Sequence, residues 1–243
     1  LCYAFRTPPE ILALWRDEHA LPELSDAAMA PSFERVESRL KVKQILPHEV
    51  NALNALVRRG CEKLGYSGFV TRHNRENCVL AGYCILGCSY DAKQSMLVTY
   101  VPSADAAGAR IFANARAERI ELEAGRARRV RGHVVDAAGR PGPAIEVEAR
   151  VVVLAAGAVA SPDLLLRSGI ANGSGQVGRN LHLHPSVMAA GIFDEAFHPY
   201  RGIPQSYYVD EFIDLASDPH RGVILMPITG FPVLTSVNLP GFG

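Results

Sequence analysis

VVVLAAGAVASPDLLLRSGI, residues 151–170, carries the most informative pattern in the chain. It begins with four apolar residues, Val151 to Leu154, a run that is too short for a helix and typical of a buried strand. Ala155, Ala156 and Gly157 follow with almost no side chain, and the apolar spacing then becomes helical. We therefore expect a strand, a tight turn and a helix N-terminus, where a ligand's phosphates or ribose can approach the backbone. Ordinary α/β packing has the same pattern, so the stretch alone favours neither interpretation.

The residues before this stretch predict a β-meander. Apolar and polar residues alternate over residues 117–123, 129–136 and 145–154, and the sequence AAGRPGP separates the second run from the third. Alternation with period two is typical of half-buried strands, and Gly and Pro mark the turn between them. We expect this meander to lead into the strand at Val151.

The first 107 residues are predominantly helical. Residues 8–65 predict three helices with solvated charged faces, the last of them ended by Gly65. Residues 65–89 are rich in Gly, Asn, Cys and Tyr and predict an ordered loop, and residues 92–107 predict a further helix. The fold class expected is a mixed α/β protein.

A second domain is predicted to begin near residue 186. After a loop, GSGQVGRNLHLHP, short strand-like runs occur at residues 187–193, 206–209 and 222–228, separated by Pro and Gly. We therefore assign residues 1–185 to one domain, and residues 186–243 to the start of an antiparallel-sheet domain.

The composition argues against a nucleic-acid partner and against a membrane-spanning segment. The chain has 243 residues, of which 48% are hydrophobic, with 25 Lys and Arg against 25 Asp and Glu. A neutral chain lacks the basic excess that nucleic acids and anionic membranes attract, so we expect no nucleic-acid partner. All apolar runs are too short to cross a bilayer.

The cysteines argue against a disulfide-stapled secreted domain, because their number is odd: Cys2, Cys61, Cys78, Cys84 and Cys88. A reducing, cytoplasmic location is therefore favoured. The last three lie in NCVLAGYCILGC with gaps of five and three residues, which match neither paired zinc ligands nor common ferredoxin spacings. Free thiols packed in a loop are the favoured interpretation, and an iron–sulfur site is the alternative.

No catalytic constellation is evident in the sequence. His182 and His184 share a side of an extended segment but have no carboxylate or cysteine at a supporting spacing, so structural histidines are favoured over a metal site. The chain has no G-x-S-x-G, P-loop or complete G-x-G-x-x-G motif.

Three blocks in order resemble the glucose-methanol-choline (GMC) family of flavin-dependent oxidoreductases. They are CVLAGYCILGCSYDAKQSMLVTYVPSA, GAVASPDLLLRSGI and VGRNLHLHP, and the resemblance covers nearly the whole chain. The second block departs from the family pattern at Ala171, where Gly is usual, a change that alters only a turn. The resemblance implies a Rossmann-like FAD-binding domain with a β-meander, followed by a substrate domain on an antiparallel sheet.

The resemblance also implies a function and its residues. An alcohol is oxidised by hydride transfer to FAD, Ala155, Ala156 and Gly157 lie against the cofactor, and the backbone of Ala117 faces its adenine. The family's Gly-rich dinucleotide fingerprint lies before this chain and its catalytic histidine beyond Gly243, so the chain is expected to be an internal portion without a catalytic residue. The alternative is a non-catalytic remnant or binding module. The identity of the alcohol and of the electron acceptor stays open.

Overall fold

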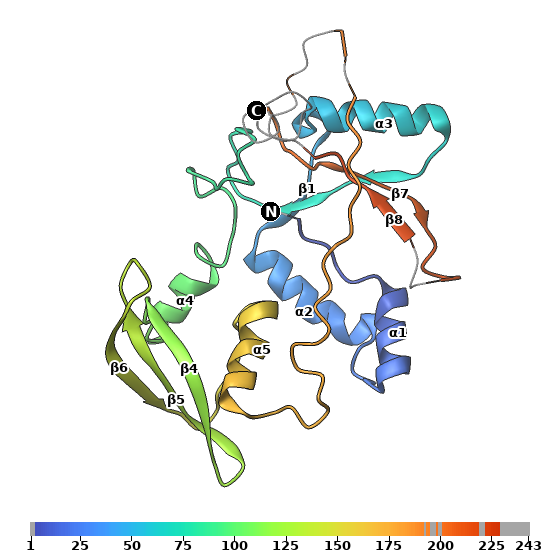
Figure 1. Cartoon of the computed structure of the whole chain (residues 1–243). Helices are drawn as coiled ribbons and strands as arrows, with labels where there is room; N and C mark the ends of the chain where they lie inside the picture. The colour runs from blue at the N-terminus through green and yellow to red at the C-terminus, as the bar shows by residue number, and fades with distance from the viewer. Residues whose placement is uncertain (1–2, 192, 195–197, 199–200, 219–221, 229–243) are drawn as a thin grey trace. The chain divides into compact units, whose positions relative to one another are not determined.

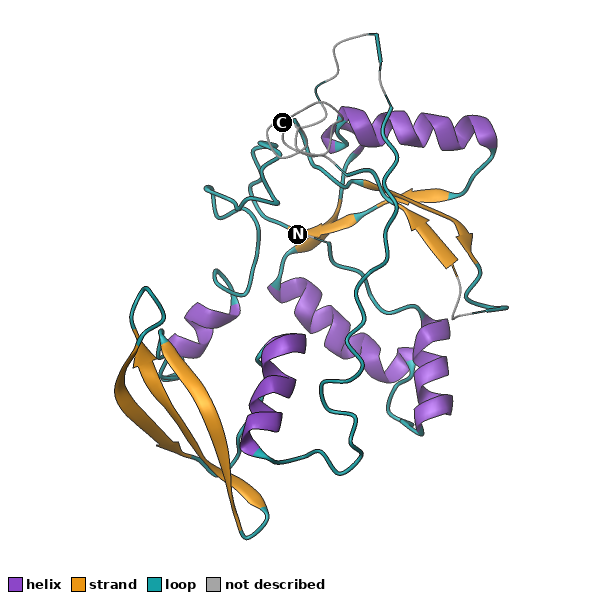
Figure 2. Cartoon of the chain, in the orientation of Figure 1, coloured by secondary structure: helices purple, strands orange, loops and turns teal. Residues whose placement is uncertain are grey.

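The computed structural model describes residues 3–191, 193–194, 198, 201–218 and 222–228. These residues form two compact units. The first unit combines residues 1–108 with residues 192–243, and the second comprises residues 109–191. Helices and strands are both present, which confirms the mixed α/β class (Figure 2). The predicted domain boundary at residue 186 stays a prediction.

The first unit contains the helical region expected near the N-terminus. Its helices are α1 (Pro9–His19), α2 (Asp26–Arg39), the 3-10 helix η1 (Pro47–Glu49), α3 (Ala52–Leu64) and α4 (Tyr100–Ala106) (Figure 1). Ser25 caps α2 by accepting a hydrogen bond from the Ala28 N–H at 3.2 Å. Gly65 ends α3 in the left-handed conformation, as its position after the last apolar residue predicts.

Two small antiparallel sheets complete the first unit. Strands β1 (Val42–Gln44) and β3 (Arg72–Asn74) pair with each other, and β2 (Gly68–Val70), β7 (Tyr207–Ile213) and β8 (Gly222–Leu225) form the order β2-β7-β8. The second sheet therefore joins strands from both sides of residue 186. The sequence predicted β7 and β8 in outline but missed β1, β2 and β3, because three-residue strands are too short to show alternation.

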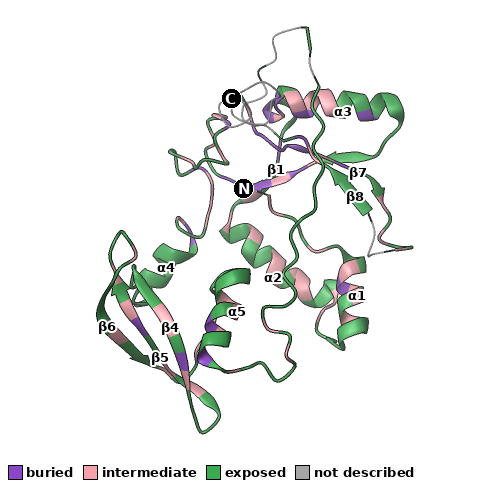
Figure 3. Ribbon diagram, viewed as in Figure 1, coloured by how far each residue is buried: buried purple, intermediate pink, exposed green. Residues whose placement is uncertain are grey.

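The core of the first unit lies between α3 and the sheet β2-β7-β8. Cys61 on α3 packs against Tyr207 and Val209 of β7, and all three are less than 7% exposed. Figure 3 shows buried positions on α3 and on β7. Since side chains alternate along a strand, Tyr208 lies on the opposite face, where its ring is 5.9 Å from the ring of Phe69. One face of the sheet thus holds the core and the other an aromatic cluster.

The second unit is a β-meander with one helix. Strands β4 (Ala115–Glu123), β5 (Arg126–Val135) and β6 (Pro141–Glu148) pair antiparallel in that order, and α5 (Gly157–Ser168) packs against β4 (Figure 1). The predicted meander and the predicted helix after Gly157 are confirmed.

The two faces of the meander differ in polarity. On one face Arg129 of β5 lies within 3.3 Å of carboxylate oxygens of Glu121 on β4 and of Glu146 and Glu148 on β6, so these ion pairs link all three strands. The other face carries the paired Ile120 and Val130, and Ile120 is only 4% exposed. Burial of this apolar face stabilises the packing of α5 on the sheet.

The predicted strand at Val151 to Leu154 is wrong for the structure as described. This segment is assigned to no strand, and the side chains of Val151 and Val153 are 75% and 82% exposed. A strand needs a neighbour to satisfy its backbone groups, and none of the described strands pairs with these residues. Val152 and Leu154 are partly buried, so the alternation of a strand is present without its ladder.

Two other predictions need correction. The helix expected over residues 92–107 is reduced to α4, because Lys93 forms a β-bridge with Arg75 and turns occupy most of residues 95–99. The strand expected at residues 187–193 is absent from residues 187–191, and residue 192 lies outside the described part of the chain. Among the described residues, no helix has the length and apolar character needed to span a bilayer.

Candidate functional site

The small-residue turn at Ala155, Ala156 and Gly157 forms the N-terminus of α5. Gly157 has a φ of +82°, a conformation that residues with a Cβ rarely adopt, and a Cβ built there would meet no atom within 4 Å. All three residues are exposed. The backbone at this turn is therefore open to a ligand.

The electrostatics of this turn favour an anion. The aligned peptide dipoles of α5 place partial positive charge at its N-terminus, and no acidic residue lies in its first turn. The Ala156 N–H donates to Ser161 Oγ at 3.1 Å, which holds the turn against the helix. Phosphate oxygens are suited to such a helix N-terminus.

Ala117, the other predicted site residue, lies on β4, one of the two edge strands of the meander. It pairs with Gly132 of β5, and the register shifts between Ala117 and Arg119, so Glu118 is a β-bulge residue. An edge strand has backbone N–H and C=O groups on its outer side that can bond a ligand. Backbone recognition of an adenine edge is compatible with this position.

Gly132 permits an unusually close approach of the two strands beside Ala117. A Cβ built on Gly132 would lie 1.8 Å from the carbonyl oxygen of Arg116, far inside van der Waals contact. Gly132 was not among the site residues predicted from the sequence. A glycine inside an alternating strand pattern is a signal for such an approach and would have identified it.

Ser168, the last residue of α5, joins the helix to β4. Its hydroxyl accepts a hydrogen bond from the Ile120 N–H at 2.9 Å and donates to the carbonyl of Leu164 at 2.6 Å. Ser168 is 7% exposed. This residue belongs to the Ser-Gly-Ile end of the second sequence block, but the sequence alone gave no partner for it.

A hollow of about 350 Å³ lies within the second unit. Its lining comes from β4, the turn after it, β5, the segment before α5, and α5 and its C-terminus: Ile120, Leu122, Gly125, Ala127, Val152, Leu154, Leu165, Ile170 and Ala171. None of these side chains can form a hydrogen bond. The hollow is thus suited to apolar atoms and lacks groups that would orient a dinucleotide.

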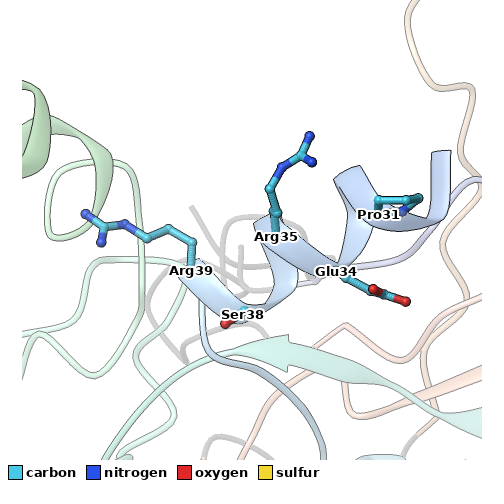
Figure 4. A pocket seen from close by; sticks show the side chains of 5 residues that line it. All are labelled: Pro31, Glu34, Arg35, Ser38 and Arg39. Carbon is cyan, nitrogen blue, oxygen red and sulfur yellow. The ribbon is translucent and has the colours of Figure 1, made fainter. Parts of the chain in front are cut away.

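A larger hollow, of about 630 Å³, follows one side of α2. All of its lining residues come from that single helix, namely Pro31, Glu34, Arg35, Ser38 and Arg39 (Figure 4). Figure 4 shows Arg35 and Arg39 extending away from the helix rather than converging with Glu34. A surface formed by one helix face does not enclose a substrate, so we assign no site there.

The cysteine-rich loop does not form a metal centre within the described residues. Cys61, Cys78 and Cys88 are free thiols, and the described part of the chain has no group of three His, Cys, Asp or Glu side chains placed to hold a metal ion. Burial raises the pKa of the Cys61 thiol, which keeps it protonated and unreactive. These observations do not support the iron–sulfur alternative.

The two histidines near the third sequence block are both exposed. His182 Nδ1 lies 3.1 Å from the backbone oxygen of its neighbour Asn180. This local contact is consistent with the structural role that we expected for His182. No catalytic role is assigned to His182 or His184.

A comparison with models of known protein families tests the resemblance that the three sequence blocks suggested. The model described as GMC oxidoreductase matches residues 1–186, about three quarters of the chain. The chain belongs to the GMC oxidoreductase family. Members of this family generally bind flavin, and the matched region is the family's N-terminal, FAD-binding part.

Curated relatives of this GMC chain agree with the assignment. An uncharacterized GMC-type oxidoreductase of Mycobacterium tuberculosis is 36% identical over 240 residues, 98% of this chain and 36% of the relative. A long-chain-alcohol oxidase of Arabidopsis thaliana is 30% identical over 197 residues, 78% of this chain and 26% of the relative. A 2-methyl-1,2-propanediol dehydrogenase of Mycolicibacterium austroafricanum is 30% identical over 162 residues, 63% of this chain and 28% of the relative. The chain thus spans about a third of the length of the curated relatives that it matches most extensively.

The residues of the GMC chain fit a bound dinucleotide in two places. The Gly157 turn offers open space and a helix N-terminus, and β4 offers a backbone edge at Ala117. Both lie in the second unit, and α5 packs on β4. Gly157 and Ser168 are at opposite ends of α5, about 16 Å apart at the rise of an α-helix. The two places therefore suit different parts of an elongated ligand.

Proposed function

We propose that this chain is part of an FAD-dependent oxidoreductase that oxidises an alcohol. The observation that carries the proposal is the family match over residues 1–186, which includes the Gly157 turn and the meander. The long-chain-alcohol oxidases and the propanediol dehydrogenase among its relatives share alcohols as substrates by name. When bound, FAD supplies the hydride acceptor for such an oxidation.

The residues of this chain have binding and orienting roles in the proposal. Gly157, with Ala155 and Ala156, lets a phosphate or ribose approach the N-terminus of α5 without a side chain in between. The backbone of Ala117, on the edge strand β4, bonds the adenine edge. We assign no catalytic residue to this chain, and the proton of the alcohol is removed by a base elsewhere in the whole protein.

The test uses the full-length protein encoded by the reading frame that contains this chain. We expect it to purify with a flavin spectrum, or to acquire one on addition of FAD, and an alcohol added without oxygen should bleach that spectrum. A folded protein that stays colourless with excess FAD would refute the proposal. Such a result would favour the non-catalytic binding module instead.

The choice of alcohol and acceptor follows from the same preparation. Because the relatives act on both long-chain alcohols and a small diol, the substrate panel should contain primary alcohols of increasing chain length and a vicinal diol. Oxygen consumption compared with reduction of an artificial acceptor separates an oxidase from a dehydrogenase.

A further inference from the structure

The backbone of β4 is held by contacts on both of its edges close to Ala117. On its inner side Gly132 of β5 approaches the Arg116 carbonyl more closely than any Cβ would allow. On its outer side the Ile120 N–H, three residues after Ala117, donates to Ser168 of α5 at 2.9 Å. The strand is therefore held from both edges around one short segment.

A constraint is needed there because of the bulge. Ala117 and Arg119 each pair with a residue of β5, and Glu118 is the extra residue between them. A bulged strand loses part of the ladder that would otherwise fix its position. The outer edge of β4 has no neighbouring strand among the described residues. The Ser168 hydroxyl provides a partner for the Ile120 N–H, two residues after Glu118.

The geometry of Ser168 makes this bond well defined. The same hydroxyl donates to the Leu164 carbonyl one turn earlier at 2.6 Å, so its hydrogen is engaged and its lone pair is directed at Ile120. Both Ser168 and Ile120 are buried, at 7% and 4% exposure. Loss of this hydroxyl would leave the buried Ile120 N–H without its partner, which is costly.

We propose that Ser168 is a positioning residue for the adenine half of the cofactor. It couples α5, whose first residue forms the phosphate-facing turn, to the part of β4 that presents the Ala117 backbone. This inference rests on the proposed function, since it requires that FAD binds at Ala117 and Gly157. Ser168 contacts neither the substrate nor the reacting atoms, and it acts through β4.

The test compares the binding of three probes to the full-length apoprotein: FAD, ADP and FMN. ADP keeps the adenine half and lacks the flavin, whereas FMN keeps the flavin and lacks the adenosine. In Ser168→Ala we expect FAD and ADP to bind about tenfold more weakly, a change of the size that one lost hydrogen bond produces, and FMN affinity to stay the same. A residue that only stabilises the fold would affect all three probes alike.

Ser103→Ala is the matched control. Ser103 makes the same bond to the carbonyl four residues earlier, from Ser103 Oγ to the Thr99 oxygen at 3.0 Å, but lies on α4 in the first unit. We expect this variant to bind all three probes like the wild-type protein. Ser168→Thr keeps a hydroxyl, so this variant should bind FAD and ADP like the wild-type protein. If Ser168→Ala does not fold, Ser168→Thr is compared with Ser168→Val, which has a similar shape and no hydroxyl.

The outcomes separate this inference from the proposed function. Equal losses for ADP and FMN, or no loss for either FAD or ADP, would overturn the role of Ser168 while leaving FAD binding intact. Failure of the wild-type protein to bind FAD at all would instead overturn the proposed function, and with it the premise of the inference. A selective loss of FAD and ADP binding supports both.

Discussion

Glu49 and Arg75 form a buried, two-pronged ion pair in the first unit. Arg75 Nη1 lies 2.8 Å from Glu49 Oε1, and Arg75 Nη2 also bonds Glu49 Oε2. The Leu46 N–H donates to the same carboxylate at 2.8 Å. Burial alone would raise the pKa of Glu49, but the Leu46 N–H and the Arg75 guanidinium together hold this pKa below its ordinary value. The pair connects the 3-10 helix η1 to the residue after β3.

Removing one partner of this pair should destabilise the first unit. In Glu49→Gln the Arg75 charge stays buried without its counter-charge, so we expect a loss of about 3–5 kcal/mol in the free energy of unfolding. Urea denaturation of the full-length protein, followed by fluorescence of Trp15 on α1, measures it. Glu62→Gln is the control, because the Arg58–Glu62 pair lies on the surface of α3 and should contribute little. Equal stability of the two variants would contradict the role given to Glu49.

His73 predicts an acid-sensitive first unit. Burial, with the nearby Arg75 charge, lowers its pKa from 6.5 to about 4, although a hydrogen bond to the Gln205 backbone opposes the shift. Between pH 6.5 and about pH 4, His73 is protonated in the unfolded chain and neutral in the folded chain. Stability is therefore complete above pH 6.5 and falls, by up to about 3 kcal/mol, as the pH drops to about 4.

Thermal unfolding at a series of pH values tests this prediction. The slope of Tm against pH between 6.5 and 4 should diminish in His73→Gln and persist in His19→Gln, which alters an exposed histidine on α1. The hydrogen bond from Arg6 lowers the pKa of Glu37 to about 2, with a further contribution from Arg72 and some opposition from desolvation. The stability that Glu37 contributes is therefore lost only below pH 4.5. An unchanged slope in His73→Gln would refute the assignment.

Gly157 provides a direct test of the cofactor-facing turn. Gly157→Val combines a left-handed φ with a side chain in the space proposed for the ligand, so FAD should bind at least about tenfold more weakly. Gly125 is a suitable control, since it has a φ of +77° and open space around it, and lies in the turn between β4 and β5. Gly125→Val should lose stability to a similar extent and keep its FAD affinity. Unchanged FAD affinity in Gly157→Val would count against the placement.

Gly132→Ala should disturb the meander. The new methyl group would lie 1.8 Å from the Arg116 carbonyl oxygen, so β4 and β5 must separate beside Ala117. We expect a loss of about 1–3 kcal/mol in stability, towards the upper end because the obstructing atom belongs to the backbone. Gly173→Ala, where a Cβ meets no atom within 4 Å, should have little effect in the same thermal-unfolding assay. Equal melting temperatures for the two variants would contradict the close approach.

Local sequence patterns determined most of the second unit. Alternation over β4 and β5 and helical spacing after Gly157 are properties of neighbouring residues, so the meander and α5 could be predicted from them. Three motif blocks in order also identified the family, since each block is a contiguous run of residues. The small-residue turn was evident for the same reason.

The contacts between residues far apart in the sequence depend on the tertiary fold. The partner of Ser168 is 48 positions away at Ile120, and Glu49 meets Arg75 across 26 positions. Neither pairing produces a periodic pattern in the sequence, because hydrogen bonds and ion pairs between separate elements depend on how those elements pack in three dimensions. Conversely, Val151 to Leu154 has the composition of a strand but no ladder partner among the described residues. A strand is defined by its neighbours, whereas a helix satisfies its own backbone, and for that reason the sequence determined α5 more completely than the strand expected before it.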